Sequence, residues 1–374
     1  MIALNFEQLT CIGLTQAVSR QLHAWNAVAS AEARLMRICE VQRDCFSAHD
    51  GNKEHQAHAW PRLLAALQEQ GDGITIGDWV LVETDAHGGL WIVDCLPPAS
   101  QLARRANDGR RQALASNVDT ALLVMGLDQD FNLRRMERYI ALVQASGVAA
   151  VAVLSKADIG IDVQARVAEL QQRLPASVPL LAVNAQDGLA CAALAPWLGA
   201  GQTLVVLGSS GAGKSTLTNT LIQQTEQQTE QQAGQQMQQP AARLQLTGGN
   251  RKGDGRGRHT TTARSLRLCD GGACIIDTPG LRTWRPDADE HALAATFEDV
   301  GWLAQHCQFR DCRHQGEPGC AVAAGLSADR LLNYHKLLRE ARRGLQTHQE
   351  RSAQLNKWKK ISKAARQRSR DKRA

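Results

Sequence analysis

One short stretch of this chain reads Gly208-Ser209-Ser210-Gly211-Ala212-Gly213-Lys214-Ser215-Thr216. It fits G-x-x-x-x-G-K-[ST], the phosphate-binding P-loop, in which glycines let backbone N–H groups turn toward a phosphate chain. The apolar run at 203–207 predicts a buried strand before it, and 216–222 predicts a helix after it, whose N-terminus adds positive partial charge. Without such neighbours the stretch would be an ordinary Gly/Ser-rich turn. In this context it predicts nucleotide binding, with Lys214 at the β- and γ-phosphates and the Ser215 hydroxyl on Mg²⁺.

The chain around the P-loop alternates apolar runs with helical periods. Strands are predicted at 120–125, 149–154, 180–183, 264–268 and 273–276, and helices at 134–146 and 163–174. Strands that alternate with helices predict a parallel sheet with helices on both faces. Ligands of such sheets bind outside the carboxyl ends of the strands, so polar motifs that follow strands become candidate site residues.

A second motif, Ser155-Lys156-Ala157-Asp158, follows one of these strands and is similar to the guanine-reading pattern N-K-x-D. The Asp158 carboxylate would accept from the guanine N1 and N2 hydrogens, and the Lys156 stem would cover the base. Adenine offers no such pair of donors, so this contact selects guanine. After the next strand, Asn184-Ala185 stands where a Ser-Ala pair usually supplies a backbone N–H to guanine O6.

The third motif is a D-x-x-G sequence from Asp277 to Gly280. On its own it is a common turn. At a strand end beside a P-loop, Asp277 would hold Mg²⁺ through water and the Gly280 N–H would sense a γ-phosphate. Thr261, in a run of three threonines, would join Ser215 in the Mg²⁺ shell when its loop closes. Because these motifs all follow strands of one sheet, together they predict a guanine-nucleotide site.

The order of the motifs is unusual. The base-reading residues precede the P-loop here, whereas ordinary GTPases place them after it. The site can still be built, because moving the chain ends around a domain leaves the carboxyl edge of its sheet intact. This order also leads the chain from the D-x-x-G motif directly into the C-terminal region.

Before the sheet, the chain has a different texture. Residues 1 to about 30 have a helical period and predict a packing arm. Several short strands between 33 and 98 predict a small β-barrel, either an OB-fold that binds oligonucleotides or a purely structural domain. Three histidines in this region, His49, His55 and His58, are predicted to be solvated in a polar loop, because no ligand spacing accompanies them. A basic connector is predicted after residue 98.

A cysteine and histidine cluster lies near the C-terminus, with the spacing Cys307-x4-Cys312-x-His314-x5-Cys320. Three thiolates and one imidazole suit a tetrahedral Zn²⁺, and four ligands leave no open position, so the ion would be structural. The alternative is that four unrelated residues fall close together by chance. The other cysteines show no ligand spacing and are predicted to be small hydrophobic residues.

Composition narrows the class of protein. The 374 residues carry a net charge of +6, and the last eighteen contain nine Lys or Arg against one Asp, which favours an RNA or other polyanion partner at that end. No apolar run of eighteen residues predicts a membrane span, and residues 1–10 do not read as a signal peptide. Ten cysteines without a secretion signal indicate cytosolic thiols, so we expect a cytoplasmic protein.

These motifs together resemble the ribosome small subunit-dependent GTPase A family, RsgA. Further marks of the resemblance are 117–120, 130–135, 255–262 and 307–314. The resemblance implies a slow GTPase that acts in late maturation of the small ribosomal subunit and is stimulated by it, with barrel and zinc domain touching rRNA. It also implies that His259 positions the attacking water, since Leu281 replaces the glutamine that does so in many GTPases. The alternative for His259 is a solvated loop residue.

Two features depart from the family pattern. Ser155 stands where asparagine is usual, which puts one contact to the base or to the P-loop in doubt, although Asp158 still predicts a preference for guanine. A Gln-rich insert at 223–239 is extra and is predicted to have no chemical role.

The sequence thus predicts a multidomain chain with an OB-like β-barrel, a circularly permuted α/β P-loop GTPase domain and a helical zinc-binding domain. The expected boundaries are 1–32 for the arm, 33–100 for the barrel, 104–285 for the GTPase domain, 286–345 for the zinc domain and 346–374 for a basic tail. The expected cofactors are Mg²⁺ with GTP and one Zn²⁺, and the expected partners are the small ribosomal subunit with its rRNA and GTP or GDP. The protein is expected to be a monomer without membrane contact.

Two other functions stay open at this point. One is an RNA-binding assembly factor that binds GTP with little turnover, and the other is a P-loop protein that uses ATP.

Overall fold

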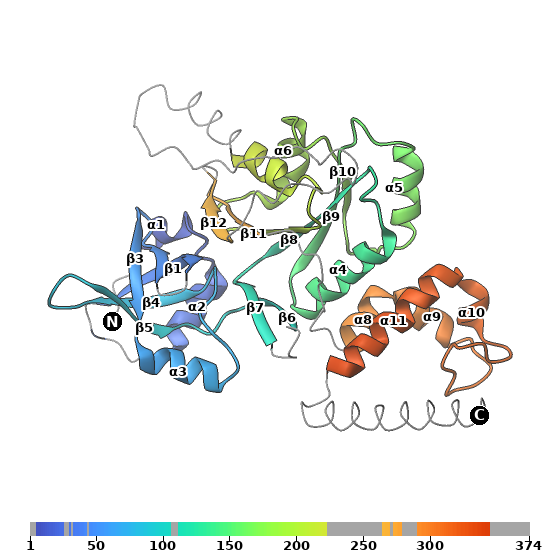
Figure 1. Cartoon of the computed structure of the whole chain (residues 1–374), viewed down its shortest axis with the longest axis horizontal. Coiled ribbons are helices and arrows are strands. Elements are labelled where there is room, and N and C mark those ends of the chain that lie inside the picture. Colours follow the sequence, from blue (N-terminus) through green and yellow to red (C-terminus); the bar gives the residue numbers. More distant parts are fainter. Residues whose placement is uncertain are drawn as a thin grey trace, which may run out of the picture.

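The structure is a computed structural model that describes residues 5–25, 30, 33–42, 45–105, 111–222, 264–269, 272–278 and 290–344. An N-terminal barrel, a central sheet with helices and a group of C-terminal helices follow one another across the molecule (Figure 1). Among the described residues, no helix has both the length and the apolar character that a membrane span requires.

The barrel closes from five strands in the order β1-β2-β3-β5-β4. They are β1 (Arg34–Val41), β2 (Phe46–His49), β3 (Glu54–Ala59), β4 (Trp79–Thr84) and β5 (Leu90–Cys95), and α3 (Pro61–Glu69) connects β3 to β4. All pairings are antiparallel except that of β3 with β5. This Greek-key order is that of an OB-fold, so the predicted OB-like barrel is confirmed.

Two strands of the barrel were not predicted, and they place the three histidines on strands rather than in a loop, with His58 exposed as expected and His49 buried. His49 ends β2 and is buried, and its Nδ1 accepts the Gly51 N–H at 3.0 Å. His55 and His58 lie in β3, where His55 contacts Asp50 at 2.7 Å. The reason is the turn at 50–53: the Asp50 carboxylate accepts backbone N–H groups at 52 and 53, and the hairpin places polar residues on short strands.

The N-terminal arm consists of α1 (Phe6–Thr10) and α2 (Gln16–Ala24). Its apolar residues pack on the barrel in one buried cluster with Leu35 and Trp79: Leu9, Ile12, Leu14 and Val18. The predicted basic connector is instead a hairpin of β6 (Gln101–Arg105) and β7 (Arg111–Ser116).

Within the described residues, the central sheet has six strands in the order β10-β9-β8-β11-β13-β12. They are β8 (Thr120–Gly126), β9 (Ala149–Ser155), β10 (Leu180–Ala182), β11 (Thr203–Gly208), β12 (Ser265–Leu268) and β13 (Cys274–Asp277). Five are parallel, and only β12 pairs antiparallel, at the edge beside β13. The predicted parallel sheet is therefore confirmed, with one antiparallel edge strand.

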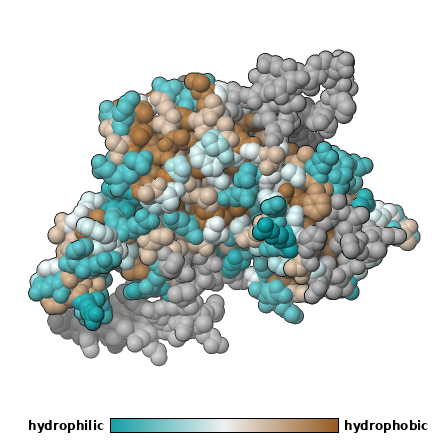
Figure 2. Space-filling model, turned by 180° about the vertical axis from the view of Figure 1, so that it is seen from behind, coloured by the Kyte–Doolittle hydropathy of each residue, from teal (hydrophilic) through white to brown (hydrophobic). Residues whose placement is uncertain are grey.

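Helices cover both faces of this sheet because successive side chains of a strand point to opposite sides. On one face, Leu123 and Met125 of β8 pack in a cluster with residues of α4 (Leu133–Ala145) and α5 (Val163–Gln171). On the other face, Leu122 and Val124 pack with the helix over 214–222 and with α6 (Leu189–Leu194), which η1 (Ala195–Trp197) follows. Seen from behind, the broadest apolar surface lies over this domain (Figure 2).

A buried arginine joins the barrel to the sheet. Arg37 of β1 is fully buried and donates to Ile12 O at 2.5 Å, to Asn117 O at 2.9 Å and to Thr203 Oγ1 at 2.9 Å. Thr203 begins β11, whose other end enters the P-loop. The barrel therefore docks at the amino edge of the sheet and leaves the carboxyl edge to the candidate site.

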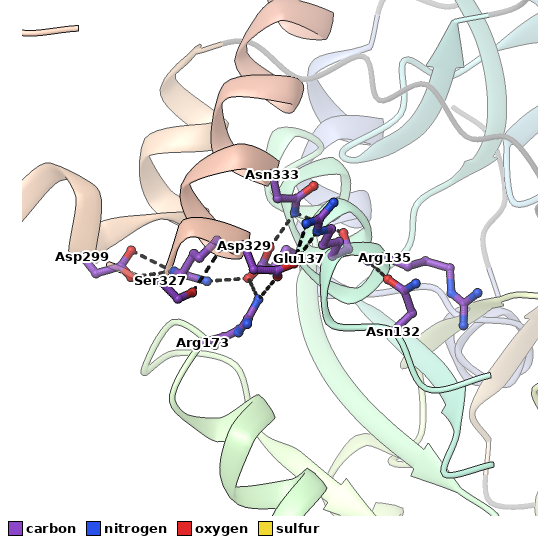
Figure 3. A network of polar contacts seen from close by, with 10 residues as sticks. Asn132, Arg135, Glu137, Arg173, Asp299, Ser327, Asp329 and Asn333 are labelled. Carbon is purple, nitrogen blue, oxygen red and sulfur yellow. Dashed lines mark hydrogen bonds and ion pairs between the residues drawn. The ribbon is translucent and has the colours of Figure 1, made fainter. Parts of the chain in front are cut away.

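Over residues 290–344, the described part of the C-terminal region, the chain forms four helices: α8 (Glu290–Thr296), α9 (Glu298–Ala304), α10 (Ala321–Gly325) and α11 (Ala328–Gly344). Phe297, Val322 and Leu337 share a core there with Ala141 of α4, so these helices pack on the sheet domain. Beside this core, a polar network centred on Glu137 links α4 to α9 and α11 (Figure 3).

Candidate nucleotide and metal sites

The P-loop follows β11 at the carboxyl edge of the sheet. A side chain at Gly208 would place its Cβ 2.3 Å from Val124 O, and Gly211 and Gly213 have φ of +85° and +86°, so glycine is required for this path. The helix begins at Lys214. Because the N–H groups of a helix's first turn have no partner within the helix, they face the loop that precedes it. This segment has the shape of an anion-binding loop at a helix N-terminus.

Lys214 lies inside this loop and is only 7% exposed. Its Nζ donates to Ser209 O at 2.7 Å. Burial lowers the pKa of the Lys214 ammonium, and the carboxylates of Asp277 and Asp130 oppose that shift. An ammonium held by one loop carbonyl, with two carboxylates in its electrostatic surroundings, is suited to exchange that contact for phosphate oxygens.

The base-reading motif begins at the end of β9, beside the P-loop. Ser155 is fully buried, and its Oγ donates to Ala212 O of the P-loop at 2.6 Å. Ser155 therefore makes a direct contact to the P-loop, which the sequence had left in doubt. Lys156 follows with φ of +62°, Ala157 N donates to Val183 O at 3.2 Å, and Asp158 is exposed at the turn.

The loop after β10 lies against the same helix. Thr220 of the P-loop helix donates to Ala185 O at 2.7 Å, and Asn184 Oδ1 accepts the Gln186 N–H at 3.0 Å. The structure thus gathers Ser155, Ala185 and the P-loop at one edge, although 184–185 and 155–158 precede the P-loop in the chain. These positions are compatible with the guanine-reading roles that the sequence predicts for them.

The D-x-x-G motif is described only in part. Asp277 ends β13, is fully buried and pairs in register with Val206 of the P-loop strand, while Thr278 Oγ1 donates to Val206 O at 2.8 Å. Asp277 therefore lies on the strand next to the P-loop, near Lys214. His259, Thr261 and Gly280 lie outside the described residues, and their predicted roles stay predictions.

Two carboxylates beside the site were not predicted. Asp130 Oδ1 accepts from Ser209 Oγ at 2.6 Å, and Asp128 Oδ2 accepts from Lys156 Nζ at 2.6 Å. Arg135 Nη2 pairs with Asp130 Oδ1 at 2.6 Å. The available signal was their place directly after the strand at 120–125, where polar residues meet the carboxyl edge of the sheet.

The predicted metal ligands come together. The ligand atoms of Cys307, Cys312, His314 and Cys320 all lie within 4.8 Å of one another. His314 Nδ1 lies 3.7 Å from the Cys307 sulfur and 3.5 Å from the Cys320 sulfur. Such separations fit four ligands around one ion with metal–sulfur bonds of about 2.3 Å and metal–nitrogen bonds of about 2.0 Å. These four residues can therefore hold a metal ion.

Local structure supports that arrangement. The His314 backbone adopts a φ of +60°, which is the left-handed conformation of a tight turn. The His314 carbonyl contacts His335 Nε2 at 2.9 Å. Cys320 is the N-cap of α10 and accepts the Ala323 N–H at 3.3 Å. Cys320 is thus fixed by the start of α10, and His314 by the contact of its carbonyl to α11. These fixed positions hold the four ligands in one compact cluster.

Comparisons with known proteins agree with this geometry. A sequence profile of the RsgA GTPase family matches residues 95–286. A protein of Xanthomonas oryzae pv. oryzae named small ribosomal subunit biogenesis GTPase RsgA is 38% identical over 371 residues, which cover 96% of this chain and 95% of the relative. A protein of the same name from Xanthomonas euvesicatoria pv. vesicatoria is 39% identical over 349 residues, with 90% and 89% covered.

Solved structures show the same fold. YjeQ from Thermotoga maritima matches with a TM-score of 0.56 at 20% identity, covering 83% of this chain and 98% of that one. YloQ, described as a circularly permuted GTPase, matches with a TM-score of 0.53 at 18% identity, covering 86% and 100%. At these identities the likeness shows the fold alone, which is that of a circularly permuted GTPase.

Proposed function

Since this chain belongs to the RsgA GTPase family and is a GTP hydrolase, we propose that it couples GTP hydrolysis to late maturation of the small ribosomal subunit, which stimulates the reaction. The observation that carries the proposal is the identity of 38% over 96% of the chain to a protein named for small-subunit biogenesis. The convergence of the base-reading loop and the P-loop at one sheet edge supports it. A cytoplasmic monomer is part of the proposal.

In the proposed reaction, GTP lies across the carboxyl edge of the sheet. Asp158 and the 184–185 loop bind guanine, and the P-loop amides with Lys214 stabilise charge that develops on the γ-phosphoryl oxygens. Ser215, Thr261 and Asp277 would hold Mg²⁺, which supplies charge neutralisation when it is bound. Asp277 is buried on the strand beside the P-loop, which suits a carboxylate that helps to bind a cation.

Water activation depends on the loop before the threonines. We propose that binding of the small subunit orders this loop and brings His259 to the attacking water. The cysteine and histidine cluster would hold one structural Zn²⁺, because three sulfurs and one imidazole nitrogen are the ligand set that tetrahedral zinc prefers. The zinc domain, the barrel and the basic tail would contact rRNA.

The test is steady-state GTP hydrolysis with and without isolated small subunits, for the wild type, Lys214→Ala and His259→Ala. We expect strong stimulation of the wild type, loss of turnover in Lys214→Ala and loss of stimulation in His259→Ala. Stimulation that survives in His259→Ala would keep the enzyme and remove the histidine from it. GTP binding without turnover in the presence of subunits would favour an RNA-binding factor that uses GTP only as a ligand.

A further inference from the structure

The order of strands places one loop between the two halves of the candidate nucleotide site. Strand β8 pairs with β9 on one side and with β11 on the other, all parallel. Because parallel strands end at the same edge, the loop 127–132 after β8 lies between the base-reading loop after β9 and the P-loop after β11. Two side chains of this loop, those of Asp128 and Asp130, contact these neighbours.

Asp128 reaches the base-reading side. Its Oδ2 accepts from Lys156 Nζ at 2.6 Å, with both side chains more than two-thirds buried. Burial by itself raises the pKa of Asp128, but hydrogen bonds from Lys156 and from the Asp130 N–H outweigh it and lower the pKa. A charge-assisted bond of this kind fixes a side chain that otherwise has many rotamers.

Asp130 reaches the phosphate side. Both of its carboxylate oxygens lie within 2.7 Å of Ser209 Oγ, and its Oδ2 accepts the Gly126 N–H at 3.2 Å. The Ser209 carbonyl in turn accepts a hydrogen bond from Lys214 Nζ. The chain of contacts therefore runs from Asp130 through Ser209 to the P-loop lysine.

Arg135 compensates the negative charge of Asp130 in this arrangement. A carboxylate beside a phosphate site would repel the phosphates. Arg135 Nη2 bonds to Asp130 at 2.6 Å and so neutralises it, and Asn132 caps α4 by accepting the Arg135 N–H at 2.9 Å. Helix α4 thus holds the guanidinium that compensates the charge of Asp130 next to the candidate phosphate site.

We infer that Asp128 and Asp130 are positioning residues for the two halves of the nucleotide: Asp128 sets Lys156 for the guanine base, and Asp130 sets Ser209 and the P-loop for the phosphates. The inference rests on the proposed function, because it assigns roles toward the same guanine nucleotide. Neither carboxylate needs to touch the nucleotide. Each acts on the nucleotide site through one side chain, Lys156 for Asp128 and Ser209 for Asp130, so its effect on nucleotide binding should disappear when that side chain is removed.

Double-mutant cycles on GDP affinity test this, using the full chain. Asp128→Asn and Lys156→Ala should each weaken GDP binding about tenfold, and the double variant should be little weaker than Lys156→Ala alone. Asp130→Asn and Ser209→Ala should show the same non-additivity. The crossed pairs, Asp128→Asn with Ser209→Ala and Asp130→Asn with Lys156→Ala, should be additive to within about twofold.

These cycles separate positioning from general stability. A carboxylate that only stabilises the loop would weaken binding equally with or without its partner, so additive cycles within both pairs overturn the inference. Glu169→Gln, an exposed charge change on α5, is the matched control and should bind GDP as the wild type does. A wild type that binds no guanine nucleotide would instead contradict the proposed function.

Discussion

Glu137 of α4 and Arg330 of α11 meet at 2.7 Å, with the Glu137 carboxylate wholly buried. Asn333 donates to the other Glu137 oxygen at 2.5 Å, and Arg330 also bonds both oxygens of Asp299. Arg173 after α5 approaches the same carboxylate at 3.5 Å (Figure 3). The C-terminal helices are therefore anchored on the helix that begins beside the P-loop.

Removing one partner of this buried pair should be costly. Arg330→Met leaves the Glu137 carboxylate buried without its closest cation, so the free energy of unfolding should fall by about 3 kcal/mol. Denaturant unfolding with tryptophan fluorescence measures it. The double variant Glu137→Leu with Arg330→Met should recover most of the loss, because the wholly buried Glu137 carboxylate is then absent.

The matched control is the exposed pair of Glu290 and Arg342, whose side chains are 52% and 61% exposed. Arg342→Gln should change the free energy of unfolding by less than about 1 kcal/mol, since exposed pairs are screened. An Arg342→Gln loss as large as that of Arg330→Met would contradict the assignment of the anchor to Glu137.

Ser155 should matter for nucleotide affinity through its contact to the P-loop. Ser155→Ala removes the donor to Ala212 O, and we expect GDP affinity to fall about fivefold because one buried hydrogen bond is lost. Ser155→Asn retains a donor and should lose less. Isothermal titration measures both. Ser116→Ala, an equally buried serine away from the site, should leave GDP affinity unchanged.

The barrel should show a pH dependence that originates in one carboxyl group. Burial raises the pKa of Asp78 to about 7, against the opposing hydrogen bond from the Thr75 N–H. Between about pH 4 and pH 7 the folded chain keeps a proton that the unfolded chain releases, so this group makes stability fall as pH rises through that window.

Asp78→Asn should remove that part of the slope and raise stability near neutral pH, because the amide still accepts the Thr75 N–H and cannot ionise. Unfolding free energies measured from pH 4 to pH 8 give the comparison. Asp162→Asn, at an exposed position, is the control and should keep the wild-type slope. An unchanged slope in Asp78→Asn would assign the effect to another group.

The metal cluster predicts a stoichiometry. Purified protein should contain one Zn²⁺ per chain by elemental analysis, and Cys312→Ser should lower that content and expose the 305–320 loop to protease. Cys11→Ser changes an exposed thiol outside the cluster and should leave both unchanged. Full zinc content in Cys312→Ser would exclude that cysteine as a ligand.

Sequence alone predicted the parts of the site that are local. The P-loop spans nine residues and the metal ligands span fourteen, so spacing, glycines and donor type determine their shape before any packing. The alternation of strands and helices likewise predicted the sheet, because burial on both faces leaves apolar runs.

The short strands of mixed polarity were not predicted from the sequence. The β2–β3 hairpin and the β6–β7 hairpin carry histidines, glutamines and arginines, and their partners in the barrel or across the hairpin set their conformation more than their own pattern does.

Only the tertiary structure decided which distant residues meet. Asp130 and Ser209 are 79 residues apart, Arg37 and Thr203 are 166 apart, and Glu137 and Arg330 are 193 apart. A lone polar residue has no periodicity, so nothing in the sequence marks its partner. Strand order and helix packing bring these groups together, and the cost of burying unpaired polar groups then makes each contact necessary.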